Sequence, residues 1–310
     1  EAFDGANAGV TMDGKVYGIP FTQEGYGFIY NAAILNKAGI NPDEITSYAK
    51  LEEAVKKLDA KKAELGLEAV FAVAGKETWV TGLHFTNAAL SPEFENVFNA
   101  FNAKKIDFKY SEGMKKLFDL QINYAKKPVN SVDYSTQVEK LFSLGKVAFM
   151  QQGNWTLGAI KGIDEELAAN IGFLPMPIVG AKEDSIPVGI PMYWTVNSTK
   201  DEKTQAAAKA FLNWMYTSEK GKDAIINKFG FIPPFKGFDS PDLQPKDALA
   251  KDIMKYASAG KTIQWVFMGY PSGWGMEKIG VDLQKYVDGK LTWDQLIENG
   301  KKSWEEARNK

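Results

Sequence analysis

Residues 13–31 have the sequence DGKVYGIPFTQEGYGFIYN, and the rest of the chain is interpreted outward from them. The opening Asp-Gly pair is a turn signal, and the residues after it predict a short strand over 15–20. A second apolar run, 27–30, predicts another strand. Gly25-Tyr26-Gly27 begins like a dinucleotide-binding fingerprint, but Tyr30 stands where that fingerprint needs glycine. The stretch therefore predicts two strands and no phosphate loop.

Helical and strand patterns alternate through the rest of the chain. Apolar residues at spacings of three and four predict amphipathic helices, and short apolar runs bounded by glycine or proline predict strands. The predicted helices begin near residues 48, 111, 138, 206, 218 and 292, and the further strands cover 146–150, 171–177 and 192–196. Thr292 and Gln295 form a capping-box pattern before the last helix. This alternation predicts α/β layers.

Composition excludes several classes of function. A length of 310 residues favours two domains, and the net charge of -2 gives no basic footprint for nucleic acid. The absence of cysteine excludes disulfides, thiolate catalysis and cysteine–zinc sites. His84 is the one histidine, so a multi-histidine metal site is excluded. Its apolar neighbours favour a hydrogen-bonded structural histidine, with a ligand contact as the alternative.

Tryptophans in glycine- and proline-rich surroundings are the clearest functional signal. Trp155, Trp194 and Trp274 lie in such segments, which suit a ring presented from a loop, and Trp79 lies next but one to Glu77. Flat aromatic faces stack on sugar rings, and polar side chains bind sugar hydroxyls. The alternative for each ring is a place in the core. For Trp214 and Trp304, on predicted amphipathic helices, the core is favoured.

Two carboxylates are candidates for chemistry. Glu24 lies in a segment rich in glycine and aromatic residues, and Glu77 lies beside Trp79. Each is interpreted as a solvated surface acid, as an acceptor for a ligand hydroxyl, or as a general acid or base of a glycosidase. The residues alone leave these alternatives open.

Several segments form an ordered set along the chain. They are 13–20, 25–31, 35–40, 142–149 with 153–155, 211–214 with 217–221, and 289–292 before the last helix. Each is a weak signal alone, but together they span nearly the whole chain. In this set the chain resembles the family 1 extracellular solute-binding proteins, the carbohydrate receptors of ABC importers, of which maltose-binding protein is a distant member.

The resemblance implies a fold and its domains. It implies an α/β, two-lobed periplasmic-binding-protein fold of the type II-like class with hinge-crossing segments. The N-terminal lobe would comprise 1–24 and 189–240, and the C-terminal lobe 25–188 and 241–310. Ligand would bind in the cleft between the lobes and favour closure about the hinge.

The resemblance also implies ligand-binding positions. Glu24 matches a hydroxyl-binding polar position, and Trp79 lies in a segment that often supplies a stacking aromatic. Trp155 matches the tryptophan of a Gly-x-Trp pattern, and Trp274 the aromatic of a late loop. The pair Tyr193-Trp194 departs from the small residues usual in the second crossing and suggests a bulkier wall. The predicted ligand-binding residues are Glu24, Tyr26, Glu77, Trp79, Asn154, Trp155, Tyr193, Trp194 and Trp274.

The start of the chain departs from the family pattern. Members usually open with roughly a hundred residues that build the first strands of the N-terminal lobe. Here the chain opens at Glu1, just before the first crossing. We therefore expect an incomplete N-terminal lobe, with the chain either a fragment or paired with a complementary N-terminal segment. Alone, it is expected to bind sugar weakly or not at all.

The function implied is that of a non-enzymatic receptor outside the cytoplasm, in the periplasm or as a cell-surface lipoprotein. It would deliver a carbohydrate, more specifically an oligosaccharide, to an ABC transporter permease. We expect no cofactor, no metal, no catalytic residue and no nucleic-acid partner. The alternatives are a receptor for another solute, such as a polyol or a phosphorylated compound, and a carbohydrate-active enzyme.

Overall fold

The computed structural model describes residues 1–3, 6–238 and 240–309, which divide by packing into two units. Unit 1 comprises 1–24 and 189–251, and unit 2 comprises 25–188 and 252–310. Three elements continue from one unit into the other: β4 (Glu24–Asn31), β8 (Ile186–Gly189) and α10 (Ala248–Ser258).

One of the expected domain boundaries is wrong. The chain returns to unit 2 after residue 251, whereas the sequence prediction placed that boundary after 240. The physical reason is packing, because Phe238 lies in the apolar core of unit 1 and Leu243 packs against that core. Residues 241–251 therefore stay with unit 1.

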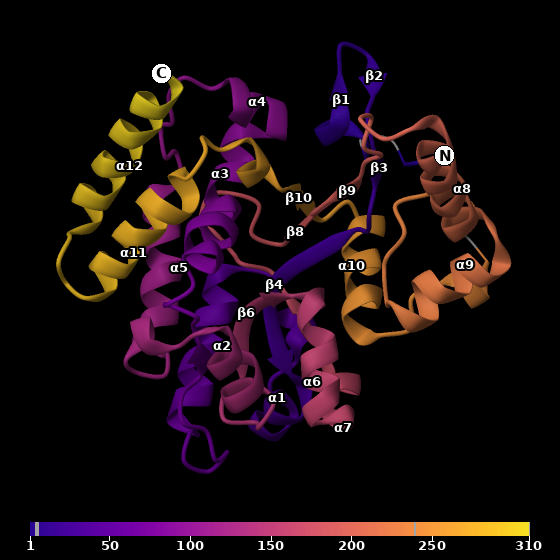
Figure 1. Ribbon diagram of the computed structural model, residues 1–310. Coiled ribbons are helices and arrows are strands. Elements are labelled where there is room, and N and C mark those ends of the chain that lie inside the picture. Colours follow the sequence, from indigo (N-terminus) through magenta and orange to yellow (C-terminus); the bar gives the residue numbers. More distant parts are fainter. Residues whose placement is uncertain (4–5, 239, 310) are drawn as a thin grey trace. The chain divides into compact units, whose positions relative to one another are not determined.

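A mixed sheet is the framework of unit 2 (Figure 1). Its strands run in the order β10 (Thr262–Gln264), β8, β4, β6 (Phe149–Gly153) and β5 (Phe71–Ala72), and β7 (Ile171–Leu174) also pairs with β4. Strand β4 runs antiparallel to β6, with Tyr26 opposite Gly153, and antiparallel to β7, with Phe28 opposite Leu174. Strands β5 and β6 are parallel, as are β8 and β10.

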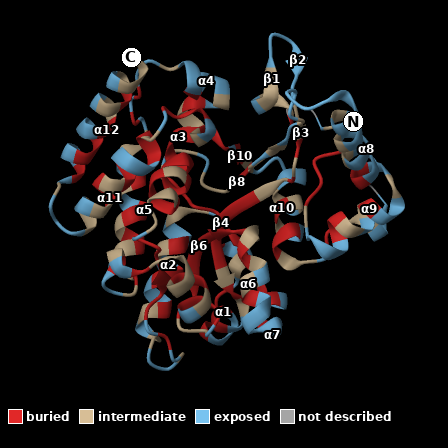
Figure 2. Ribbon diagram, viewed as in Figure 1, coloured by how far each residue is buried: buried red, intermediate tan, exposed pale blue. Residues whose placement is uncertain are grey.

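Strand β4 is buried over most of its length (Figure 2). Its aromatic residues Tyr26 and Phe28 favour a strand, and both are fully buried. Gly27 is needed at its position, because a Cβ there would collide with the carbonyl oxygen of Leu174 on β7. Glycine at this position thus permits close pairing of β4 with β7.

Helices surround this sheet, and their ends follow the capping rules. Helix α2 (Tyr48–Ala60) begins at residue 48, as predicted, after the N-cap Ser47, and α12 (Trp293–Arg308) begins with the predicted Thr292–Gln295 capping box. Helices α3 (Thr86–Phe94) and α5 (Ser111–Asn123) lie side by side (Figure 1). The other α-helices of unit 2 are α1 (Ala32–Ala38), α4 (Val97–Asn102), α6 (Leu157–Ile163), α7 (Glu165–Ala169) and α11 (Gly280–Val287).

Short 3₁₀ and π segments complete unit 2. The 3₁₀ segments are η2 (Pro42–Glu44), η4 (Val129–Ser131), η6 (Asn154–Thr156) and η9 (Val266–Gly269). The π segments are η3 (Val80–Phe85), η5 (Thr136–Phe142) and η10 (Trp274–Ile279). The stripe predicted as a helix from residue 138 is η5, and the strand predicted over 146–150 is β6, which begins at Phe149.

Unit 1 has a smaller core. Its strands are β1 (Thr11–Met12), β2 (Lys15–Val16), β3 (Ile19–Pro20) and β9 (Tyr193–Trp194), and its α-helices are α8 (Glu202–Thr217) and α9 (Glu219–Asp223). Segments η1 (Ala8–Val10), η7 (Ala224–Lys228) and η8 (Pro241–Leu243) complete it. The buried members of this core cluster are Met215, Tyr216, Ile225, Ile226, Phe235 and Phe238.

The predicted core position of Trp214 is wrong. Trp214 is 45% exposed and Phe211, on the same helix α8, is 56% exposed. Their rings stack on each other with centroids 5.9 Å apart, so they form a pair on the helix surface. Trp304 on α12, by contrast, is fully buried, as predicted.

Among the described residues, no helix combines the length and the apolar character needed to cross a bilayer. The same residues contain no group of three or more histidine, cysteine, aspartate or glutamate side chains arranged to hold a metal ion.

Candidate ligand-binding site

Seven aromatic side chains meet in unit 2 and form what we call the aromatic cluster. Its centre is His84 on η3, whose imidazole stacks on Tyr26 of β4 with ring centroids 4.3 Å apart. Around His84, ring centroids lie 5.2 Å away for Trp79, 5.3 Å for Trp155 and 5.2 Å for Phe267. The full cluster is Tyr26, Trp79, His84, Tyr134, Trp155, Trp265 and Phe267.

The cluster has a buried layer and a half-exposed layer. Tyr26, His84 and Trp265 are buried. The side chains of Trp79, Tyr134, Trp155 and Phe267 keep intermediate exposure. Half-exposed rings on a buried aromatic base can offer flat faces to a ligand, while the base holds them in place.

Gly153 explains how Trp155 reaches this layer. Strand β6 ends at Gly153, and the ring of Trp155 folds back over it, so that a Cβ at this position would overlap the indole. The backbone at Gly153 is extended, with φ of -117°, so glycine is needed here for space and not for its conformation. The Gly-x-Trp pattern therefore has a steric cause.

Hydrogen bonds fix the two half-exposed indoles. The Trp155 Nε1–H donates to Gln152 Oε1 at 3.0 Å, and Gln152 Nε2 donates to Gln137 Oε1 at 2.7 Å. The Trp79 Nε1–H donates to Glu77 Oε2 at 3.2 Å. Such bonds restrict rotation of both rings before any ligand arrives.

Glu77 has a positioning role in this arrangement. Its second oxygen, Oε1, accepts the backbone N–H of Tyr134 at 3.2 Å, while Oε2 accepts the indole of Trp79. One carboxylate thus ties together two half-exposed rings from different segments. Glu77 is itself half-buried, so its remaining lone pairs can still accept a ligand hydroxyl.

Asn154 lies between Gly153 and Trp155 with one end of its amide in use. Its Oδ1 accepts the N–H of Gly25 at 3.1 Å. Its Nδ2 donates to no group among the residues that the structure describes, and the side chain is of intermediate exposure. Asn154 therefore offers a free donor next to Trp155.

His84 is electrically neutral in this setting. Burial lowers its pKa from 6.5 to about 3, because the surrounding rings cannot solvate an imidazolium. The expected structural role for His84 agrees with its burial, but the imidazole forms no hydrogen bond with the described residues, contrary to expectation. It supports the half-exposed rings through stacking.

Two of the expected ligand contacts are wrong. Trp274 is 1% exposed, packs edge to face on Trp304 at 4.9 Å and donates its Nε1–H to Gly300 O at 3.0 Å. Tyr26 is fully buried under His84, and its hydroxyl donates to the carbonyl of His84 at 3.1 Å. Neither ring has a face open to a ligand, so both are structural.

Three expected site residues belong to unit 1. Tyr193 and Trp194 form β9, which pairs with β3, and the Trp194 Nε1–H donates to Tyr216 Oη at 2.9 Å. Glu24 is the last residue of unit 1 before Gly25, and burial raises its pKa from 4.5 to about 7. Whether these three side chains contact ligand stays a prediction.

The sequence interpretation missed three members of the cluster. Trp265 follows β10 directly and Phe267 comes two residues later, so the alternation of large rings after a strand was a usable signal. Tyr134 had no comparable signal, because it is brought to Trp79 by its backbone bond to Glu77.

Comparison with known proteins gives the fold its context. The chain is 28% identical over 218 residues to the melibiose/raffinose/stachyose-binding protein MelE of Bacillus subtilis. The matched part is 65% of this chain and 47% of that protein, so the chain spans about half the length of the curated relative it matches.

Solved structures are similar over nearly the whole chain. A chitin oligosaccharide binding protein has a TM-score of 0.77 and 22% identity, covering 97% of this chain and 73% of its own. The apo form of RafE from Streptococcus pneumoniae has a TM-score of 0.76 and 18% identity, covering 99% and 76%. The expected α/β fold of the two-lobed periplasmic binding proteins is thereby confirmed.

A family model gives the assignment. The model described as bacterial extracellular solute-binding protein matches residues 1–255. Since that is well over half of the 310 residues, the chain belongs to the family of bacterial extracellular solute-binding proteins.

Proposed function

We propose that this protein is the extracytoplasmic receptor of an ABC importer and that it binds an oligosaccharide on the aromatic cluster. The observation that carries the proposal is the pair of half-exposed indoles, Trp79 and Trp155, whose ring centroids lie 6.3 Å apart at 56°. Two rings at an angle can contact two successive sugar units, and Tyr134 next to Trp79 and Phe267 next to His84 add further ring surface.

Polar groups for the sugar hydroxyls lie beside these rings. Asn154 offers its Nδ2 as a donor, and Glu77 offers lone pairs as an acceptor. A mostly apolar surface with a few convergent polar groups is the usual composition of a small-molecule site. This combination supports a carbohydrate more strongly than an apolar or a highly charged ligand.

The names of the similar proteins suggest which sugars to test first. The curated relative is named for melibiose, raffinose and stachyose, and one of the similar structures for chitin oligosaccharide. We propose that the ligand of this protein belongs to the same chemical class of short oligosaccharides. Its delivery to a permease, by closure of two lobes around the ligand, is part of the proposal.

The cellular location follows from the family at a coarse level. Membership of an extracellular family supports a place outside the cytoplasm. The finer alternatives, the periplasm or a lipid-anchored cell surface, are part of the proposal.

Thermal unfolding of the full-length protein with a sugar panel tests the proposal. The panel contains raffinose, stachyose, chito-oligosaccharides, monosaccharides, a polyol and a sugar phosphate. A ligand at 100 times its dissociation constant stabilises the folded state by about 2.7 kcal/mol, which gives a clear shift in Tm. The carbohydrate assignment would be contradicted if only the polyol or the sugar phosphate raised the Tm. It would also be contradicted if no compound of the panel did.

Chromatography of the best ligand after incubation separates a receptor from an enzyme. A receptor returns the sugar unchanged, and that is the expected result. Cleavage products would instead favour a carbohydrate-active enzyme, for which Glu24 and Glu77 would be the first carboxylates to substitute.

A further inference from the structure

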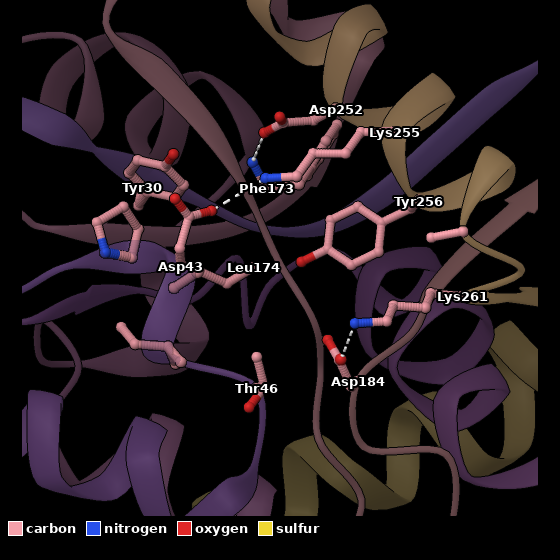
Figure 3. A pocket seen from close by; sticks show the side chains of 13 residues that line it. Tyr30, Asp43, Thr46, Phe173, Leu174, Asp184, Asp252, Lys255, Tyr256 and Lys261 are labelled. Atoms are coloured by element: carbon pink, nitrogen blue, oxygen red, sulfur yellow. Dashed lines mark hydrogen bonds and ion pairs between the residues drawn. The ribbon is translucent and has the colours of Figure 1, made fainter.

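A cavity lies in unit 2 outside the aromatic cluster (Figure 3). Its volume is about 190 Å³, and every residue that lines it belongs to unit 2. Because an apolar cavity of about 150 Å³ can hold benzene, this one has room for a small organic molecule but not for an oligosaccharide.

Strand β4 shows that the two places are distinct. Tyr26 of β4 belongs to the aromatic cluster, and Tyr30 of the same strand lines the cavity. Four residues of strand correspond to about 13 Å between their Cα atoms. A ligand in the cavity therefore leaves the rings of the cluster free.

The charges around the cavity do not cancel. Lys255 Nζ pairs with Asp43 Oδ1 at 3.0 Å, and Lys261 pairs with Asp184, so both ammonium groups already have a carboxylate partner (Figure 3). The third carboxylate, Asp252, accepts the backbone N–H of Phe173 at 2.8 Å through Oδ2. Two lysines against three aspartates leave a net charge of -1 among the lining residues.

Asp252 carries this excess charge in a partly buried position. Burial raises its pKa, although the Phe173 amide and nearby Lys255 act in the opposite direction. Gly172 makes room for the carboxylate, because a Cβ there would come within 2.6 Å of Asp252 Oδ2 and would also collide with the Tyr30 hydroxyl. A cation beside Asp252 would compensate a carboxylate that the protein leaves short of partners.

Aromatic side chains supply the walls. Tyr30 and Tyr256 line the cavity, and the Tyr256 hydroxyl points into it (Figure 3). Neither tyrosine hydroxyl has a hydrogen-bond partner among the described residues. Burial raises the pKa of Tyr30 to about 12 and that of Tyr256 still further, so both rings are neutral and keep their electron-rich faces.

We propose that this cavity binds a small organic ammonium compound, with Asp252 as its counter-ion and the rings of Tyr30 and Tyr256 beside its alkyl groups. A carboxylate with neutral aromatic walls is the combination that attracts such cations. A small anion is disfavoured because both lysines are already paired and the lining is net negative. The proposal stands independently of sugar binding at the aromatic cluster.

Choline is the probe, and its uncharged analogue neohexyl alcohol, in which carbon replaces nitrogen, is the matched control ligand. Binding is followed by isothermal titration at constant ionic strength and by the NMR shift of the Phe173 amide, which donates to Asp252. The expected result is a saturable shift with choline and binding at least about tenfold weaker for the alcohol. Equal binding of the two compounds, or no binding of choline at millimolar concentration, would overturn the proposal.

Asp252→Asn tests the counter-ion without removing the acceptor that Phe173 needs. Its choline affinity is expected to fall at least about tenfold. Glu64→Gln, which removes a negative charge from an exposed position of unit 2, is the matched control and should leave the affinity unchanged. Tyr256→Leu gives a second test if Asp252→Asn folds poorly, as judged by its Tm. Wild-type affinity in either cavity variant would contradict the assignment.

Discussion

The imidazole of His84 lies flat on the ring of Tyr26, with centroids 4.3 Å apart and an angle of 13° between the planes. Its other contacts are also aromatic: Trp79, Trp155, Trp265 and Phe267 have ring centroids between 5.2 and 5.9 Å away. A histidine so enclosed can support the half-exposed rings only while it is neutral, since a buried imidazolium would be poorly solvated.

Acid should therefore destabilise unit 2 through His84. Its pKa is lowered to about 3 in the folded protein, against about 6.5 when unfolded, so the unfolded state binds the proton more tightly. The stabilisation is complete above pH 6.5 and is lost as the pH falls toward 3. Each pH unit below 6.5 should cost about 1.4 kcal/mol of unfolding free energy relative to a variant without histidine.

His84→Phe is that variant, since it keeps a ring on Tyr26. Urea unfolding of both proteins from pH 7.5 to 4.5 measures the difference, and carboxylates elsewhere affect both alike. NMR of the one histidine gives an independent reading, with no titration expected above pH 4.5. A constant difference in stability across this range, or a histidine that titrates near pH 6.5, would contradict the burial of His84.

Substitution of Trp155 should weaken sugar binding directly. Trp155→Ala removes a half-exposed indole from the cluster, and the best sugar of the panel should bind about tenfold to a hundredfold more weakly. Trp79→Ala should act in the same direction. Isothermal titration measures both, with Trp214→Ala as the control, because Trp214 is a tryptophan exposed on α8 of unit 1. Unchanged affinity in both cluster variants would exclude the cluster as the sugar site.

Local pattern predicted many of the elements. The Thr292–Gln295 capping box and the start of α2 at Tyr48 are where the sequence placed them, because such signals depend on side chains only three or four residues apart. Packing between segments that are distant in the sequence could not be predicted from local patterns. Trp79, Trp155 and Phe267 are far apart in the sequence and meet only because β6, η3 and η9 converge around His84.

Glycine next to tryptophan has two different structural roles in this chain. At Gly153 the absence of a side chain makes room for the half-exposed ring of Trp155. At Gly275, next to Trp274, it allows close packing of η10 on η3, since a Cβ there would collide with Leu83. The sequence pattern predicted an exposed ring at both places, and only Trp155 keeps part of its ring exposed.

Trp274→Ala should therefore cost stability. The ring is enclosed by Tyr270, Trp304 and Phe108, and its removal should lower the free energy of unfolding by about 3–5 kcal/mol. Trp155→Ala, with a partly exposed ring, should cost clearly less. Urea unfolding of the two variants at one pH measures the contrast. Equal losses would mean that Trp155 belongs to the core as fully as Trp274 does.

The indole N–H groups of Trp265 and Trp304 differ in hydrogen bonding, and this difference predicts a difference in stability between their phenylalanine variants. Trp265 Nε1 is buried without a hydrogen-bond partner among the described residues, whereas Trp304 Nε1 donates to Ala103 O at 2.9 Å. Both substitutions by phenylalanine remove similar volume, but only Trp304→Phe breaks a hydrogen bond. Trp304→Phe should therefore be less stable than Trp265→Phe by about 1–2 kcal/mol in urea unfolding. The reverse order would show that Trp265 Nε1 has a partner, such as an ordered water.

Gly153→Ala should impair sugar binding by displacing Trp155. The extended backbone at Gly153 accepts alanine, so the added methyl group acts only through its overlap with the indole ring. Affinity for the best sugar should fall about tenfold, with a stability cost of about 1–3 kcal/mol. Gly158→Ala on α6 is the matched control, because a Cβ there meets nothing within 4 Å.

In a Trp155→Ala background, Gly153→Ala should have little further effect on affinity, since the ring that it displaces is gone. Additive losses in that double variant would show that Gly153 acts on the sugar directly or through another residue.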